Sequence, residues 1–318
     1  MKPVLFASTR PIERAENLKA AFDAYDGGKA FVQTDVYRRH PIIRSGAFDL
    51  MVIDEFPNET PRKCIMMWHA IQGGKYIGLD QPHPYYRAER AGLMDYIVTS
   101  GSGAVPMFAR CSGLPTEKVL ALGMPRTDAY LGKRKGDGGT VLAEKKRAWL
   151  FAPTWRAKEE PAMPEIDWER LDRMMTDDEM IAVKGHMMTR GLEIGKFRHI
   201  IEIPPTEPSS PYLYDCDAVV TDYSSILFDG YLLGKPGVLF EKAKGYTDAR
   251  GMYMRYPEAY CSRYCTDEEE LIDCLRNADG IGEIERVCLR YVADMCDGHA
   301  GERIAKLIHA LADDAEEA

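Results

Sequence analysis

Short apolar runs recur along the chain and alternate with longer stretches in which apolar residues have helical spacing. The runs are only three or four residues long and contain many β-branched residues, as strands buried inside a parallel sheet do. They cover residues 4–7, 50–53, 64–67, 96–99, 150–152, 181–184, 199–201, 218–221 and 237–240. Amphipathic stretches at 12–25, 167–175 and 268–277 lie between some of them. The alternation predicts an α/β fold with parallel sheets and right-handed crossovers.

The length of the chain and one break in its apolar pattern indicate two domains. A chain of 318 residues is long enough for two domains of about 150 residues each. A charged, glycine-rich stretch without apolar periodicity occupies residues 132–139. We therefore expect a first domain over residues 1–135, a second over 136–300 and a C-terminal helix over 301–318.

Composition narrows the class of partner. The net charge of −9 argues against a nucleic-acid binder and against a broadly basic membrane-binding surface. The first residues lack the apolar core of a signal peptide, and no apolar stretch is long enough to cross a membrane. The eight cysteines are scattered without zinc-site spacing, which predicts free thiols. A cytoplasmic protein is expected, with any membrane contact peripheral.

The run at 218–221 leads into Asp222, Tyr223, Ser224 and Ser225, and an apolar pattern of helical spacing follows. Backbone N–H groups, two hydroxyls and the positive end of a helix would then meet at the carboxyl edge of a parallel sheet. Such a place suits a phosphate. The alternative is an ordinary capped turn between a strand and a helix, and this segment alone does not decide between the two.

Four other segments combine with this one into a recognisable set. They are Trp68-His69 with Gly73 and Gly74 behind it, Gly123-Met-Pro-Arg126-Thr-Asp128, Ala152-Pro-Thr154-Trp-Arg156, and Lys184-Gly-His186. In this order, and with the segment at 297–303, they resemble the CDP-glycerol glycerophosphotransferase family of teichoic-acid primases and polymerases. The chain departs from the family pattern at Ala70, where the family has Gly, and at Met187, where Pro often follows the second His.

This resemblance implies a fold and a reaction. The fold is of the GT-B type, with two Rossmann-like domains facing a cleft and a C-terminal helix that crosses back to the first domain. The reaction transfers glycerol phosphate, or a related polyol phosphate, from CDP-glycerol or CDP-ribitol to an acceptor hydroxyl and releases CMP. The acceptor would be a polyol phosphate, a glycan or a lipid-linked molecule at the inner face of the cell membrane. No cofactor or metal is expected, since the acidic residues form no clear Asp-x-Asp pair at a strand end.

The reaction requires a base near the acceptor hydroxyl and cationic or hydrogen-bonding groups on the leaving CMP. His69, at the end of a strand, is the expected base. His186 is expected to act on the diphosphate, with Lys184 two residues earlier and so on the same side of the strand. A structural histidine beside a Trp and a solvated basic strand end remain the alternatives.

Several other residues are expected to bind the substrate: Arg126, Thr154, Arg156, Asp222, Ser224, Ser225, Glu241 and Arg250. The planar guanidinium of Arg156 suits a phosphate. Glu241 lies where GT-B enzymes often bind ribose hydroxyls, whereas Asp222 is better suited to orienting the loop, because like charges repel. Arg126 could equally form a structural ion pair with Asp128.

Two other functions are open. One is a GT-B glycosyltransferase or a related epimerase that uses a UDP- or GDP-sugar, which a screen of donors would distinguish. The other is a non-catalytic nucleotide-binding or assembly protein that keeps the fold. The presence of both His69 and His186 argues against this last function.

Overall fold

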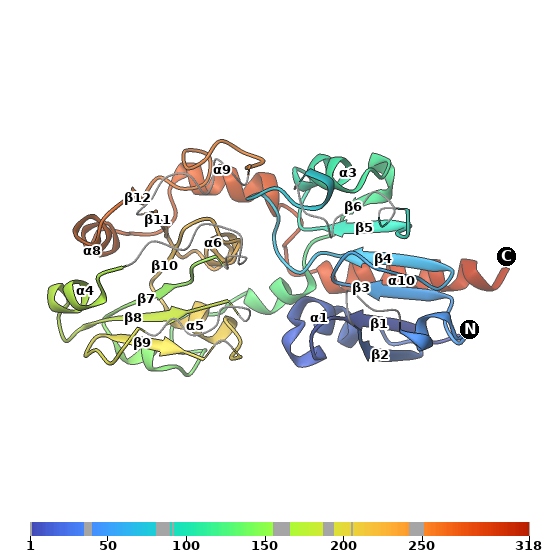
Figure 1. The fold of residues 1–318 in the computed structure, drawn as a ribbon, viewed down its shortest axis with the longest axis horizontal. Coiled ribbons are helices and arrows are strands. Elements are labelled where there is room, and N and C mark those ends of the chain that lie inside the picture. The colour runs from blue at the N-terminus through green and yellow to red at the C-terminus, as the bar shows by residue number, and fades with distance from the viewer. Residues whose placement is uncertain are drawn as a thin grey trace. The chain divides into compact units, whose positions relative to one another are not determined.

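The computed structural model describes residues 2–34, 40–80, 90, 92–154, 166–186, 194–204, 206–241 and 251–317. The chain divides into two compact units, which we call unit 1 (Met1–Leu131 with Arg290–Ala318) and unit 2 (Gly132–Leu289). Each unit contains one six-stranded sheet in which all pairings are parallel (Figure 1). The parallel α/β fold predicted from the sequence is thus confirmed.

The sheet of unit 1 has the strand order β2-β1-β3-β4-β5-β6. Its strands are β1 (Val4–Ser8), β2 (Lys29–Gln33), β3 (Leu50–Ile53), β4 (Lys63–Met67), β5 (Tyr96–Thr99) and β6 (Val119–Ala121). Its helices are α1 (Glu16–Ala24), α3 (Ala104–Ser112) and α10 (Ala300–Glu317). Short 3₁₀ helices are η1 (Ile12–Arg14), η2 (Pro41–Arg44), η3 (Gly78–Asp80), η4 (Thr116–Lys118) and η5 (Pro125–Tyr130).

The core of unit 1 is assembled from both ends of the chain. Val4 and Phe6 of β1 pack in one cluster with Leu18 of α1 and with Ile304 and Ile308 of α10. Successive strand residues point to opposite faces, so these contacts place α1 and α10 on the same face of the sheet. The carboxylate of Asp128 accepts hydrogen bonds from the first amides of α10 and so fixes the start of that helix, with Oδ1–N (Ala300) at 3.1 Å and Oδ2–N (Gly301) at 2.8 Å.

The sheet of unit 2 has the order β12-β11-β10-β7-β8-β9. Its strands are β7 (Arg147–Phe151), β8 (Glu179–Lys184), β9 (Ile200–Ile203), β10 (Ala218–Thr221), β11 (Gly237–Phe240) and β12 (Tyr264–Cys265). Its helices are η6 (Val141–Glu144), α4 (Trp168–Met174), α5 (Ser210–Asp215), α6 (Ile226–Leu232) and α8 (Glu268–Arg276). Helix α9 (Glu283–Val292) includes the point at which the chain returns to unit 1.

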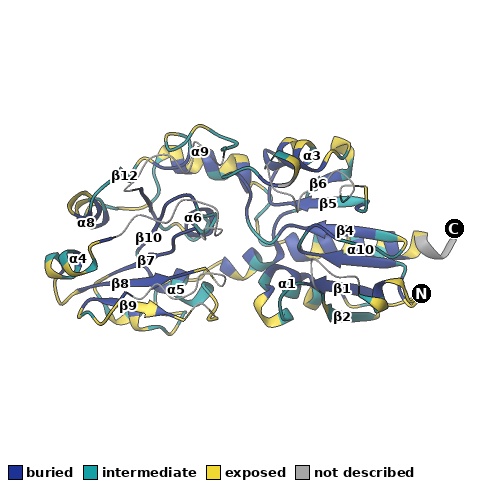
Figure 2. Ribbon diagram, viewed as in Figure 1, coloured by how far each residue is buried: buried dark blue, intermediate teal, exposed yellow. Residues whose placement is uncertain are grey.

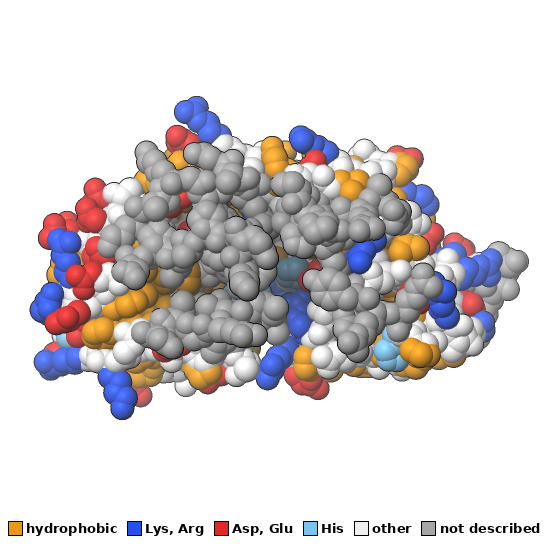
Figure 3. Space-filling model, in the orientation of Figure 1, with side chains coloured by type: hydrophobic (Ala, Val, Ile, Leu, Met, Phe, Trp, Pro, Cys, Tyr) orange, Lys and Arg blue, Asp and Glu red, His pale blue; other side chains and the backbone are white. Residues whose placement is uncertain are grey.

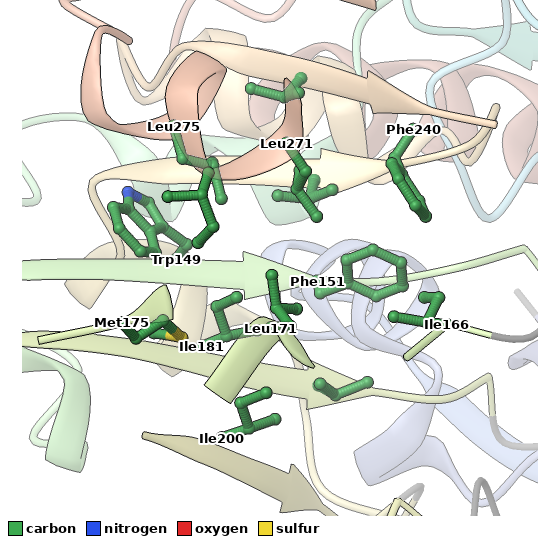
Figure 4. Packing of buried hydrophobic residues seen from close by; sticks show 14 of the residues in the cluster. Trp149, Phe151, Ile166, Leu171, Met175, Ile181, Ile200, Phe240, Leu271 and Leu275 are labelled. Atoms are coloured by element: carbon green, nitrogen blue, oxygen red, sulfur yellow. The ribbon is translucent and has the colours of Figure 1, made fainter. Parts of the chain in front are cut away.

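The two faces of the unit 2 sheet have separate cores. Figure 4 shows Trp149 and Phe151 of β7 with Leu171 of α4 and with Leu271 and Leu275 of α8. The intervening β7 residues point the other way and pack with α5. Burial of each large apolar side chain contributes about 1.5–3 kcal/mol. Because β7 is covered on both faces, it reads in the sequence as a continuous apolar run.

Burial follows this layering, since strand residues are mostly buried and the exposed residues lie mainly on helices and loops (Figure 2). Figure 3 shows acidic and basic side chains interspersed where α4 and α8 lie, and there Arg170 pairs with Glu269 and Arg173 with Glu169. The net charge is therefore not gathered there into one acidic surface. Among the helices described, none has the length and apolar character needed to cross a membrane.

One predicted helix is wrong in detail. The amphipathic stretch 12–25 is not one helix but η1 followed by α1, because Ala15 between them has non-helical angles of φ −94° and ψ 57°. The glycine-rich stretch 132–139 is the first segment of unit 2 and is bound to the end of α5. The carboxylate of Asp215 accepts hydrogen bonds from the amides of Gly136, Gly138 and Thr140, at 2.8, 2.9 and 2.7 Å.

Candidate functional site

In unit 2, one carboxylate joins the ends of two central strands. Asp222, directly after β10, accepts hydrogen bonds at Oδ1 from the Thr154 amide (3.0 Å) and the Thr154 hydroxyl (2.6 Å). The same oxygen accepts from the amide of Tyr223 at 2.6 Å. Thr154 follows β7, which pairs with β10. Asp222 is buried and therefore holds the two loops at the carboxyl edge of the sheet in one arrangement.

The two serines after Asp222 form the turn that begins α6. Their backbone oxygens accept from the amides of Leu227 and Phe228, at 3.2 and 3.0 Å. The amide of Ser224 donates to the hydroxyl of Thr221 at 3.2 Å. It therefore serves the turn itself, which differs from the expectation that this amide holds a phosphate oxygen. The side chains of Ser224 and Ser225 are half-buried, and their hydroxyls are the groups suited to a ligand.

Glu241, directly after β11, lies beside two tyrosines that the sequence analysis did not identify. Its Oε2 accepts a hydrogen bond from the Tyr264 hydroxyl at 3.3 Å, and Tyr256 donates to the backbone oxygen of Asp222 at 2.8 Å. The rings of Tyr256 and Tyr264 are 6.3 Å apart and nearly perpendicular. Burial first, and then the charge of Glu241, raises the pKa of Tyr256 well above its usual range and that of Tyr264 to about 12.

Lys184 and His186 lie at the end of β8 and differ in exposure. Lys184 is the last residue of β8 and is buried, whereas His186 follows the strand and is exposed. Strands β8, β7, β10 and β11 are successive neighbours in the sheet. The carboxyl edge of this sheet therefore carries Lys184 at the end of β8, and Thr154, Asp222 and Glu241 in the loops after β7, β10 and β11. The predicted residues Arg156 and Arg250 lie outside the described residues.

In unit 1, His69 lies in a cluster of charged side chains. It follows β4, while Asp54 and Glu55 follow β3 and Arg10 follows β1. The Nδ1 atom of His69 is 3.3 Å from the backbone oxygen of Asp54 and 3.3 Å from Oε1 of Glu55. Arg10 Nη2 donates to Asp54 Oδ2 at 2.6 Å. We call Arg10, Asp54, Glu55 and His69 the histidine cluster.

The two carboxyl groups of the histidine cluster have different surroundings. Burial raises the pKa of Asp54, and the guanidinium of Arg10 together with the hydroxyl of Ser8 partly offsets the rise. Glu55 keeps a side-chain exposure of 20%. Burial and the neighbouring Asp54 raise the pKa of Glu55 to about 8, against the effect of Arg10. The change of charge on Glu55 therefore falls near neutral pH.

Residues of the turn at 123–128 and of the segment at 297–303 make several contacts within unit 1. Asp128 binds the start of α10, as described above, and Arg126 donates from Nη1 to the Tyr130 hydroxyl at 2.7 Å. Arg303 of α10 donates to both oxygens of Asp297, at 2.7 and 3.0 Å, and from Nε to the backbone oxygen of Leu122 at 2.9 Å. These contacts connect the C-terminal segment to the loop after β6.

No group of three or more His, Cys, Asp and Glu side chains within the described ranges is arranged to hold a metal ion. All eight cysteines are free thiols.

Comparison with known protein families identifies the chain. The family model described as CDP-Glycerol:Poly(glycerophosphate) glycerophosphotransferase matches residues 35–310. The teichoic acid glycerol-phosphate primase of Bacillus subtilis (strain 168) is 24% identical over 262 residues, 78% of this chain and 68% of the relative. The teichoic acid glycerol-phosphate transferase of Staphylococcus aureus is 28% identical over 238 residues, which cover 67% of this chain and 60% of the relative. The ribitol-phosphate polymerase TarK of the same species is 23% identical, over 82% and 56%. The chain thus spans less than two thirds of the length of several of its relatives.

Solved structures show the same fold. A structure of a variant of the wall teichoic acid polymerase TagF has a TM-score of 0.75 and 20% identity, and the match covers 100% of this chain and 90% of that one. The MnaA-UDP co-structure from S. aureus has a TM-score of 0.63 and 15% identity, over 98% and 97%. At these identities the likeness concerns the fold alone. The motifs at the strand ends and the match over residues 35–310 carry the assignment: this chain belongs to the CDP-glycerol:poly(glycerophosphate) glycerophosphotransferase family.

Proposed function

We propose that this protein transfers glycerol phosphate from CDP-glycerol to an acceptor hydroxyl in the synthesis of a teichoic-acid-like polymer, with release of CMP. The observation that carries the proposal is the family match over residues 35–310, which includes strand ends of both sheets. The relatives named above are teichoic acid primases, transferases and polymerases. A lipid-linked acceptor at the cytoplasmic face of the membrane would fit such a polymer.

The donor is assigned to the carboxyl edge of the unit 2 sheet. The hydroxyls of Ser224 and Ser225 and the cationic Lys184 are suited to a diphosphate, because a phosphate accepts hydrogen bonds and is anionic. Asp222 orients this loop through Thr154 rather than contacting phosphate. Glu241 and the tyrosine beside it are suited to ribose hydroxyls and a base, since they combine a carboxylate with an aromatic ring. The CDPG soak of a TagF variant is a precedent for donor binding in a protein of this fold.

The reaction is assigned to the two histidines. His69 takes the proton of the acceptor hydroxyl while the oxygen forms a bond with the phosphorus that bears glycerol. The bond from that phosphorus to the bridging oxygen breaks, and CMP leaves with the electron pair. His186, at the edge that binds the diphosphate, donates a hydrogen bond or a proton to the leaving phosphate. Arg126 acts on unit 1 through its contact with Tyr130 and has no direct part in this scheme.

The polyol is the finer part of the proposal. The description of the family model names glycerophosphate as the transferred group. A relative named for glycerol phosphate and one named for ribitol phosphate match this chain with similar sequence identities, 28% and 23%. CDP-glycerol is the first donor to test for this reason, and CDP-ribitol is the second. UDP-sugars are the alternative from the wider fold, because the MnaA-UDP co-structure shares the architecture.

The test is CMP release from CDP-glycerol and CDP-ribitol with a bacterial lipid extract as acceptor, beside UDP- and GDP-sugars. We expect release from one CDP-polyol that is lost in His69→Ala and His186→Ala. His299→Ala is the matched control, because that side chain is 69% exposed on the surface of unit 1. Turnover of a sugar nucleotide without CMP release would replace the proposal by a glycosyltransferase. Stable binding of CDP-glycerol without turnover, with every acceptor fraction, would indicate a non-catalytic relative.

A further inference from the structure

The contacts of His69 determine which ring nitrogen carries the proton. Nδ1 lies 3.3 Å from the backbone oxygen of Asp54, and a carbonyl oxygen can only accept a hydrogen bond. Nδ1 is therefore protonated in the neutral ring, and the lone pair is on Nε2. Nε2 is thus the nitrogen able to take a proton from a hydroxyl.

Glu55 contacts the same protonated nitrogen. Its Oε1 lies 3.3 Å from Nδ1, within ion-pair distance of the nitrogen that is hydrogen-bonded to the backbone oxygen of Asp54. A carboxyl oxygen can accept a hydrogen bond whether the group is protonated or ionised. In the ionised form its charge also favours an imidazolium ring, because opposite charges at this distance stabilise each other.

A buried ion pair holds the segment that carries both of these oxygen atoms. Arg10 Nη2 and Ser8 Oγ bind Oδ2 of Asp54 at 2.6 and 3.1 Å, and Asp54 is adjacent to Glu55 in the chain. The other oxygen, Oδ1, is buried and has no hydrogen-bond partner among the residues described here. Leaving such an atom unsatisfied costs about 1–3 kcal/mol. Such a free-energy cost beside a candidate base is expected where the arrangement of the side chains is needed for function.

The imidazole ring of His69 also packs against the side chain of Trp68. The rings of Trp68 and His69 are 4.5 Å apart with an interplanar angle of 33°. Trp68 is in turn packed edge-on against Phe56 and Phe108, at 5.8 and 5.9 Å. Ring packing against Trp68 and the hydrogen bond to the Asp54 backbone oxygen together restrict the orientation of the imidazole.

We propose that Glu55 is the positioning residue of His69, keeping the proton on Nδ1 and stabilising the imidazolium that forms when Nε2 takes the proton of the acceptor hydroxyl. This proposal rests on the transfer reaction proposed above. In that reaction the hydroxyl proton moves to Nε2, the acceptor oxygen forms a bond with phosphorus, and the bond to the CMP oxygen breaks. Glu55 itself touches no reacting atom.

The charge states of the pair are coupled. Burial raises the pKa of Glu55 to about 8, so the negative charge that favours an imidazolium ring is present mainly above that pH. Among the described residues, the charged groups facing Glu55 are Asp54 on its own segment, Arg10 from the segment after β1 and His69 from the segment after β4. Removal of the Glu55 charge then makes protonation of His69 harder.

The experiment compares Glu55→Gln and Glu55→Ala with the parent protein in the CMP-release assay over a range of pH. Gln keeps an oxygen acceptor but no charge, and Ala keeps neither. We expect kcat to fall about tenfold in Glu55→Gln and about a hundredfold in Glu55→Ala, with the donor KM changed less than about twofold. The acid limb of the kcat profile should change in both variants, because in the parent protein this limb includes the ionisation of Glu55 near pH 8. Heteronuclear NMR of the histidine rings should show the Nδ1–H form of His69 in the parent.

Glu59→Gln is the matched control, because Glu59 is a buried carboxylate of the same loop that binds Arg44 Nε at 2.8 Å and the amide of His40. It should leave the acid limb unchanged. Unchanged kcat and acid limb in both Glu55 variants would overturn the proposal, as would an Nε2–H ring in the parent. An equal loss at every pH would also overturn it, because that is the result expected of a merely structural carboxylate.

The failure of this proposal can be told apart from failure of the transfer reaction. If His69→Ala retains turnover, or if no CDP-polyol is consumed, the transfer mechanism itself is wrong. If turnover depends on His69 but not on Glu55, only the positioning role is wrong. The NMR measurement needs no substrate and tests the protonation of His69 in either case.

Discussion

The carboxyl edges of the two sheets have the same architecture and opposite chemistry. The edge in unit 2 presents hydroxyls and a lysine beside two carboxylates, of which Asp222 is turned inward to bind Thr154 and Glu241 accepts a hydrogen bond from Tyr264. The edge in unit 1 presents two carboxyl groups next to a histidine. The first arrangement suits an anionic donor and the second suits removal of a proton. The same parallel scaffold, used twice, thus presents two different sets of side chains at its carboxyl edges.

The largest effects are expected from one variant at each edge, which should change different kinetic constants. His69→Ala should lower kcat by about a hundredfold or more with little change in the donor KM, because a general base acts only in the transition state. Lys184→Ala should instead raise the donor KM about tenfold, since it removes a charge-assisted contact with phosphate. Initial rates of CMP release measured against donor concentration provide both constants. Equal effects of the two variants on KM would contradict this difference between the edges.

A second test addresses the inward carboxylate of unit 2. Asp222→Ala removes hydrogen bonds to the Thr154 amide and hydroxyl and to the Tyr223 amide. We expect a loss of about 2–4 kcal/mol in unfolding free energy, because buried donors lose a charged acceptor. Urea denaturation measures the loss. Thr154→Val, which removes one of these hydrogen bonds, should cost less, and an equal cost would argue against Asp222 as the common acceptor.

A third test concerns residues that belong to the family motifs but not to either edge. Arg303→Ala removes the contacts with Asp297 and the Leu122 carbonyl. Stability should fall by about 1–3 kcal/mol, while the donor KM of the folded protein stays within about twofold. The Asp297 partner has a pKa lowered to about 2 by the same guanidinium, so this stabilisation is present above the usual carboxyl pKa and is lost as pH falls toward 2. A large change in KM would instead give Arg303 a role in binding.

The last test is a pH dependence of stability in unit 1. The pKa of Glu55 is raised in the folded protein to about 8, so its contribution is complete below the unfolded value and is lost as pH rises through 8. In Glu55→Gln the side chain cannot ionise, so this loss of stability at high pH does not occur. The unfolding free energy of the variant relative to the parent should therefore increase as the pH rises from 5 to 9. Denaturation curves at several pH values would show it, and a constant difference would contradict the raised pKa.

The apolar runs predicted nine strands because strands covered on both faces leave a continuous signal. The three strands not predicted lack it: β2 is half-buried, β6 has three residues and β12 has two. Asp54 and Glu55 directly follow the predicted strand at 50–53, so a search for polar residues after every strand would have found them. The contact of Tyr256 with Asp222 could not be predicted, since 34 residues separate the two and only the packed fold brings them together.

The composition of unit 1 has a consequence for the order of biosynthesis. Its core requires Ile304 and Ile308, which leave the ribosome long after the strands they cover. Unit 2 is continuous in sequence and can complete its core earlier, because domains fold during synthesis as their residues emerge. Until α10 is made, the apolar face of the first sheet lacks part of its cover. A premature stop between residues 290 and 300 would therefore leave unit 2 complete and deprive the unit that carries His69 of its last helix.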